Sequence, residues 1–174
     1  SAIGYMLQKD HLFEWRNIFS NISLGLEIQK RLDEPARQEL LEMMAAYGLA
    51  GFEYAKPSEL SGGMRQRAAL IRTLALKPDL LLLDEPFSAL DYQTRLSVCD
   101  DISSIIRQTH KTAILVTHDL SEAISVADRI LVLSPRPGRV KKILSIDFPE
   151  NCIRSLDRRN CPEFSTYFNM VWKE

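Results

Sequence analysis

The chain has 174 residues, of which 45% are hydrophobic and 26% charged, and its formal net charge is −1. These values are typical of a globular domain with a sizeable core, and the balanced charge gives no basic excess for nucleic acid. No apolar run approaches the roughly 18 residues of a membrane-spanning helix, and the first residues lack a signal-peptide pattern. We therefore expect any contact with a membrane to be made through a partner.

The first predicted element is a short strand over residues 3–7, which ends at Gln8. Taken alone, one glutamine after a strand is an ordinary polar loop residue. Phe13 and Trp15 follow in a polar stretch, where one use of aromatic side chains is to anchor the loop.

Apolar residues then recur at helical spacing in two successive segments. Asn17 is a suitable cap for the first helix, and Asp33 for the second, which has Pro35 in its first turn. Gly48 is a natural stop for the second helix.

A glycine turn, Ser61-Gly62-Gly63, opens the next helix. Backbone N–H groups without neighbouring Cβ atoms, a serine hydroxyl and the positive end of a helix together favour phosphate binding. Such a turn is weak evidence by itself, because glycines more often serve turn geometry. Arg65 and Arg67 on this helix are expected to be solvated or structural, and not catalytic.

Four consecutive leucines, residues 80–83, precede Asp84 and Glu85. They predict a strand buried on both faces, as in parallel sheets, whose carboxylates emerge where open α/β sheets bind ligands. The alternative is a solvated acidic pair at the end of the strand. A short loop ending at Asp91 follows.

Residues 113–116 predict another buried strand, which is followed by His118. Asp119 and Glu122 form a start like a capping box for the next helix. This arrangement of strand, histidine and helix predicts that His118 points at the same sheet edge. A further strand over residues 129–133 and a ribbon over residues 140–148 come next.

The three cysteines show no paired CxxC spacing. Cys99 lies on an apolar helical stripe and is expected in the core. Neither a disulfide nor a metal site is expected at Cys152 and Cys161, and a reducing compartment fits best.

Together, these motifs resemble the ATP-binding subunits of ABC transporters. LSGGMRQR corresponds to the signature motif of that family, LLLLDEP to its Walker B strand and SALD to its D-loop. Gln8 stands at the place of the Q-loop glutamine and His118 at that of the switch histidine. The turn PRPGRV and the tail containing PEF resemble the nitrate, sulfonate and taurine branch of the importer ATPases.

The resemblance implies an α/β fold of the P-loop NTPase class, ABC ATPase type. It has a parallel-sheet core, incomplete at the N-terminus, and an inserted α-helical subdomain. The expected divisions are residues 1–16 for the Q-loop region of the core and 17–76 for the helical subdomain with the signature helix. Residues 77–147 form the remaining core and 148–174 the tail.

The resemblance also implies three catalytic roles. Glu85 would orient and polarise the attacking water, His118 would hydrogen-bond the γ-phosphate, and Gln8 would reach the water and Mg²⁺. Asp84 would hold Mg²⁺ through its water shell. The residues implied to bind ATP are Ser61, Gly62, Gly63, Asp84 and Asp91.

The implied cofactors are ATP and Mg²⁺, and the implied location is the cytoplasmic face of the plasma membrane. The implied partners are a second copy or a paired ATPase subunit, a transmembrane permease and, indirectly, a substrate-binding protein, with no nucleic acid. Phe13 and Trp15 would line the groove that accepts a coupling helix of the permease.

None of the 7 glycines is followed by lysine, so the GxxxxGK phosphate loop is not in this chain. Each charge-assisted hydrogen bond to phosphate contributes roughly 1.5–3 kcal/mol, so we expect the chain alone neither to bind ATP well nor to hydrolyse it. We also expect an exposed sheet edge and exposed apolar surface. Two alternatives stay open: a truncated, non-enzymatic module that docks on a membrane partner, and a non-transport ABC ATPase.

Overall fold

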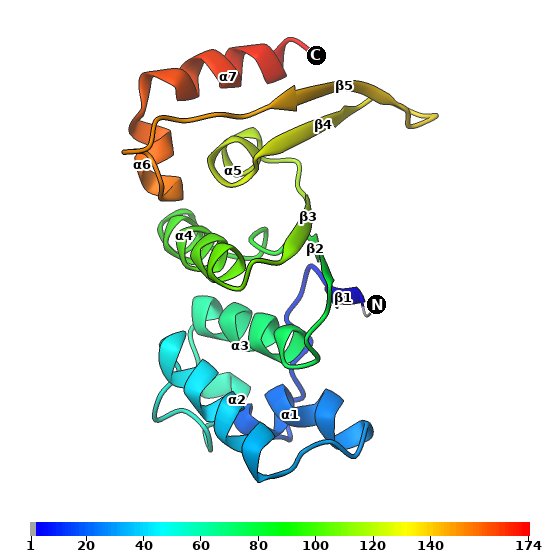
Figure 1. The fold of residues 1–174 in the computed structure, drawn as a ribbon, viewed down its shortest axis with the longest axis vertical. Coiled ribbons are helices and arrows are strands. Elements are labelled where there is room, and N and C mark those ends of the chain that lie inside the picture. The colour runs from blue at the N-terminus through cyan, green and yellow to red at the C-terminus, as the bar shows by residue number, and fades with distance from the viewer. Residues whose placement is uncertain (1–2) are drawn as a thin grey trace. The chain divides into compact units, whose positions relative to one another are not determined.

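The computed structural model describes residues 3–174 (Figure 1). Its elements, in chain order, are β1 (Ile3–Met6), α1 (Ile18–Ile28), α2 (Glu34–Ala46), the 3₁₀ helix η1 (Pro57–Glu59), α3 (Gly62–Leu74), β2 (Leu80–Asp84), α4 (Tyr92–Gln108), β3 (Thr112–Val116), α5 (Leu120–Val126), β4 (Arg129–Leu133), β5 (Val140–Ser145), α6 (Ser155–Asn160) and α7 (Pro162–Trp172). The chain forms two compact units, of which the first ends at Val116 and the second is Thr117–Glu174. Over residues 3–174, no helix combines the length and the apolar character needed to cross a membrane.

The first unit contains a parallel sheet in the order β1-β2-β3. The parallel pairing of β1 with β2 and of β2 with β3 brings the carboxyl ends of all three strands to one edge. On one face the backbone lies close to α3, because a Cβ atom at Gly4 would be 2.7 Å from Thr73 Cγ2. The opposite face exposes Ile3, Tyr5 and Ile114, each by half or more of its surface.

The expectation that the leucine strand is buried on both faces was wrong. Leu81 and Leu83 are buried, whereas Leu80 and Leu82 are only partly covered. Side chains along a strand alternate between the two faces, and the residues that the structure describes leave one face incompletely covered. In the same described region β3 pairs only with β2, so the predicted exposed sheet edge is present.

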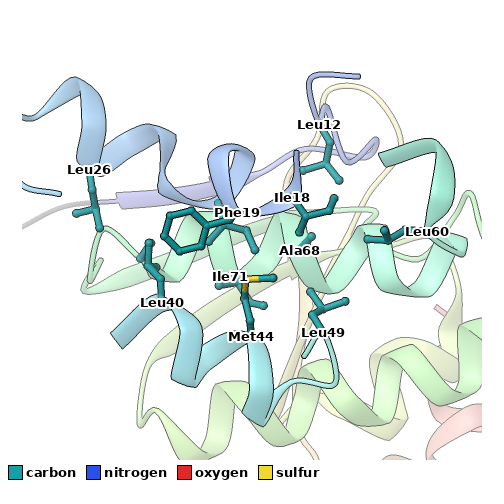
Figure 2. Packing of buried hydrophobic residues seen from close by; sticks show 12 residues of the cluster. Leu12, Ile18, Phe19, Leu26, Leu40, Met44, Leu49, Leu60, Ala68 and Ile71 are labelled. Carbon is teal, nitrogen blue, oxygen red and sulfur yellow. The ribbon is translucent and has the colours of Figure 1, made fainter. Parts of the chain in front are cut away.

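Helices α1, α2 and α3 enclose the main apolar core of this unit (Figure 2). The predicted caps are confirmed, since the amide of Ser20 donates to Asn17 Oδ1 at 2.7 Å and that of Ala36 to Asp33 Oδ1 at 2.9 Å. Gly48 follows α2 with a φ of +72°, a conformation that favours glycine. Side chains of the core with no or almost no exposed surface are Ile18, Ile22, Leu40, Met44, Leu49 and Ile71.

The second unit contains the antiparallel pair β4 and β5, with a small core formed by residues of α5, α7 and the two strands. Its tail contains a disulfide between Cys152 and Cys161, so the expectation of no disulfide there was wrong. Helix α6 lies between the two residues and returns the chain, so that their Cα atoms are 6.9 Å apart. Cys99, in contrast, is a free cysteine in the core of the first unit, as predicted.

Candidate functional site

Three polar side chains meet beyond the carboxyl ends of β1 and β2. Gln8 Nε2 donates to Glu85 Oε2 at 3.3 Å and to Ser88 Oγ at 3.2 Å. The hydroxyl of Ser88 in turn donates to the backbone oxygen of Glu85 at 3.0 Å. The fold therefore brings Gln8 and Glu85, two of the three residues with predicted catalytic roles, into direct contact.

The backbone of Glu85 has an unusual conformation. Its φ is +44°, in the left-handed region that non-glycine residues seldom adopt. The amide of Glu85 donates to the Val116 carbonyl of β3 at 2.8 Å, which holds the chain in this bend. A conformation of this kind costs about 1–3 kcal/mol and persists where its surroundings fix it, often at functional sites.

Asp84 has a partner that sequence reasoning missed. The hydroxyl of Tyr5 donates to Asp84 Oδ2 at 3.0 Å. In the register of β1 and β2, Tyr5 lies opposite Leu82, so Tyr5 and Asp84 lie on the same face of the sheet. The hydrogen bond to Asp84, together with desolvation and the carboxylate charge, raises the pKa of Tyr5. The contact depends on the register of β1 and β2, which no signal in the sequence gives.

The glycine turn, which is predicted to bind phosphate, also has a role in packing α3 against α4. Ser61 caps α3, because its Oγ accepts a hydrogen bond from the amide of Met64 at 3.3 Å. Ser61 and Gly62 are exposed, so the start of the helix is accessible. Gly63 is buried against α4, and a Cβ atom there would lie 2.7 Å from Val98 Cγ2.

Asp91 and His118 are both placed at helix starts. The Asp91 Oδ1 accepts from the amide of Thr94 at 3.1 Å and caps α4, and the hydrogen bonds from Thr94 lower the pKa of Asp91. His118 belongs to the second unit, where Asp119 caps α5 by accepting from the amide of Ser121 at 2.8 Å. The approach of His118 to Glu85 and the contact of Asp91 with ATP remain predictions.

The two aromatic residues of the loop after β1 differ in their environments. Phe13 is half-buried, and its amide donates to Asn21 Oδ1 at 2.6 Å, which anchors the loop to α1. The ring of Trp15 contacts that of Phe13 in a tilted arrangement with centroids 4.7 Å apart, yet 74% of the Trp15 surface is exposed. Phe13 is thus the more buried of the two aromatic residues, and Trp15 is the more accessible one.

Comparisons with known proteins agree with the motifs. A model of the ABC transporter family matches residues 1–88. The chain is 48% identical to the uncharacterized ABC transporter ATP-binding protein YtlC of Bacillus subtilis, over 99% of the chain and 66% of that protein. It is 45% identical to the taurine import ATP-binding protein TauB of Yersinia pestis, over 83% of the chain and 57% of that protein.

The aliphatic sulfonates import ATP-binding protein SsuB of Bacillus licheniformis is 41% identical, over 98% of the chain and 64% of its own length. The chain thus spans between 57% and 66% of the length of these three relatives. Among solved structures, a dimeric post-hydrolysis state of the ATP-binding cassette MJ0796 bound to ADP and Pi has a TM-score of 0.67 at 30% identity. That match covers 85% of the chain and 64% of the cassette, and it confirms the predicted fold class.

Proposed function

This chain belongs to the ABC transporter ATP-binding proteins, and we propose that the whole protein hydrolyses ATP to power the uptake of a small solute through a membrane permease. The contact of Gln8 with Glu85 at the carboxyl ends of parallel strands carries this proposal. The relatives named for taurine and aliphatic sulfonate import support a solute of the nitrate, sulfonate or taurine kind.

The chemistry assigned to Glu85 is that of a base which orients and polarises the attacking water. Gln8 donates to its carboxylate and Val116 fixes its backbone, so the carboxylate is held in place before ATP arrives. Asp84 and Gln8 are the residues that would hold Mg²⁺, because carboxylate and amide oxygens are ligands of the kind this ion takes. When bound, Mg²⁺ neutralises charge on the phosphates.

The phosphate contact is assigned to the accessible start of α3, at Ser61, Gly62 and Gly63. A helix start with a serine hydroxyl and an exposed glycine favours an anion. We propose that a second copy or a paired ATPase subunit supplies the facing half of the site, which the dimeric state of the cassette MJ0796 bound to ADP and Pi supports. Asp91 and His118 would complete the nucleotide contacts.

The exposed Trp15 supports docking of the permease at the loop after β1. The permease would in turn receive the solute from a substrate-binding protein. The ATPase would then lie on the cytoplasmic face of the plasma membrane.

Glu85→Gln in the whole protein tests the enzymatic proposal. Steady-state hydrolysis should fall by roughly 10²–10⁴-fold, because the amide cannot act as a base, while binding of a fluorescent ATP analogue should persist. Glu39→Gln is a matched control, since Glu39 forms an exposed ion pair with Lys77 at 2.8 Å, on α2. Undiminished hydrolysis by Glu85→Gln would show that the base is misassigned. Absence of hydrolysis by the wild-type protein would favour the non-enzymatic docking module.

We also propose that the 174-residue chain by itself binds ATP weakly and does not hydrolyse it, because it has no GxxxxGK loop. Hydrolysis by the purified chain at the rate of the whole protein would contradict this proposal.

A further inference from the structure

The guanidinium of Arg65 joins α3 to the loop of residues 8–16. Its Nε donates to Asp10 Oδ2 at 2.9 Å, and its Nη2 donates to Asp10 Oδ1 at 3.2 Å and to Glu14 Oε1 at 2.8 Å. The side chains of Arg65 and Asp10 are only 24% and 19% exposed. A sheltered two-point contact of this kind is stronger and more directional than an ordinary surface ion pair.

Asp10 accepts two further hydrogen bonds, one at its carboxylate and one at its backbone oxygen. Its Oδ1 accepts from the amide of Leu12 at 2.9 Å, which closes a tight turn of the loop. The backbone oxygen of Asp10 accepts from Arg72 Nη2 at 2.6 Å, and that of His11 accepts from Arg72 Nη1 at 2.8 Å. Arg65 and Arg72 lie about two turns apart on α3. One face of this helix therefore binds the loop at two points, through the Asp10 carboxylate and through the loop's backbone carbonyls.

The conformation of His11 shows that the loop is constrained. Its φ is +47°, in the left-handed region that is uncommon for residues other than glycine. Such a conformation persists where the surroundings determine it. The bonds from Arg72 to two successive carbonyls and the turn made by Asp10 flank this residue and supply that constraint.

This loop and α3 connect the two halves of the candidate site. At one end, Gln8 donates to Glu85. At the other end, the amide of Arg65 donates to the carbonyl of Ser61 at 2.9 Å, in the first turn of α3. Glu85 is thus linked to the glycine turn by the hydrogen bond from Gln8, the backbone of residues 8–10, the ion pair of Asp10 with Arg65, and the first turn of α3.

Both members of the ion pair stay charged near neutral pH. Desolvation acts to raise the pKa of Asp10, but hydrogen bonds from Arg65 and Leu12 and the charges of Arg65 and Arg72 outweigh it, so this pKa lies below its ordinary value. The hydrogen bond with Asp10 is the main reason why the pKa of Arg65 is raised.

We propose that Arg65 and Asp10 are positioning residues, which hold the glycine turn Ser61–Gly63 and the pair Gln8–Glu85 as one rigid group. Neither residue touches a reacting atom in this assignment. The affinity for ATP at the glycine turn then depends on an ion pair that lies outside the nucleotide contacts. The inference rests on the proposed ATP function for its kinetic consequence, but the rigid coupling is a property of the fold.

The kinetic test compares Arg65→Gln, Asp10→Asn and the double variant in the whole protein. Each single variant should raise KM for ATP roughly tenfold, as the loss of one charge-assisted contact implies, and should change kcat much less. The double variant should match Arg65→Gln, because that single variant already removes the contact with Asp10. Arg65→Lys should recover part of the affinity, since lysine keeps the charge but not the forked geometry.

Arg67→Gln is the matched control. Arg67 lies on the same helix, is 22% exposed, and pairs with Asp101 at 2.7 Å, away from the loop. This variant should leave KM for ATP unchanged. A pair that only stabilises the fold would reduce the amount of active protein and so lower kcat with KM unchanged, and that result for Arg65→Gln would overturn the proposal. Equal KM changes in Arg65→Gln and Arg67→Gln would overturn it as well.

Hydrogen exchange of the whole protein separates this inference from the proposed function. In Arg65→Gln, amides of residues 10–14 and of residues 62–65 should both exchange roughly tenfold faster than in Arg67→Gln, because the two segments lose their common restraint. Faster exchange confined to residues 10–14 would overturn the proposal. This readout decides the coupling even if the wild-type protein hydrolyses no ATP, a result that would refute the proposed function alone.

Discussion

Gly63→Ala tests how the glycine turn is built. Gly63 is buried at the start of α3, and a Cβ atom there would lie 2.7 Å from Val98 Cγ2 and 3.2 Å from Thr94 Cγ2. Both neighbours are β-branched residues of α4, whose χ1 angles have little freedom in a helix. Val98 is 2% exposed, so it has no open space into which to move. An alanine at this position must therefore push α3 and α4 apart.

The expected loss of stability follows from two opposed effects. Inserting a methyl group into a closely packed contact costs about 1–3 kcal/mol. Alanine returns up to about 1 kcal/mol, because glycine is a poor helix former. The net loss is then roughly 1–2 kcal/mol, which for a chain of this size lowers Tm by about 2–8 °C.

Thermal unfolding followed by circular dichroism measures this shift. Gly138→Ala is the control, because a Cβ atom at Gly138 meets no atom within 4 Å, and its Tm should stay unchanged or rise slightly. If Gly63→Ala unfolds at or above the wild-type temperature, the packing argument is refuted, and the glycine would serve only the approach of a phosphate.

Three further predictions concern charge and exposed surface. Because the folded pKa of Asp10 is depressed, its contribution to stability is present above the unfolded pKa of about 4 and is lost as pH falls through the folded value. Urea unfolding between pH 7 and pH 3 should therefore show the wild-type advantage over Asp10→Asn shrinking as pH falls below about 4, and an advantage that stays constant down to pH 3 would contradict the assignment. Tyr5 should ionise at higher pH than an ordinary tyrosine. In an NMR titration of tyrosine carbons, Asp84→Asn should lower the pKa of Tyr5, and an unchanged titration would exclude the contact with Asp84. Ile114 and Val116 are 50% and 54% exposed on β3, so the 174-residue chain should self-associate in sedimentation experiments. Val116→Lys should reduce this self-association. A wild-type chain that stays monomeric at all concentrations would argue against an exposed sheet edge.

Some features of this protein are local, and for these the sequence was sufficient. The caps at Asn17, Asp33 and Asp119 satisfy amides two or three residues away, so their chemistry is visible in short segments. The four leucines of β2 have the composition and length of a strand, so this element could be predicted without knowledge of its neighbours. The resemblance to ABC ATP-binding subunits assigned Glu85 and Gln8 to the same chemistry in advance, and their contact agrees with parallel strands whose carboxyl ends lie at one edge.

Other features depend on contacts between distant segments, and these only the tertiary structure decided. Arg65 was predicted to be solvated or structural, and its partner Asp10, which lies 55 residues away, could not be inferred from helical spacing. The contact of Tyr5 with Asp84 required the register of β1 and β2, and the packing role of Gly63 required the position of α4. The energies of such contacts depend on burial and on the distance between atoms, and both are set only when the elements pack together.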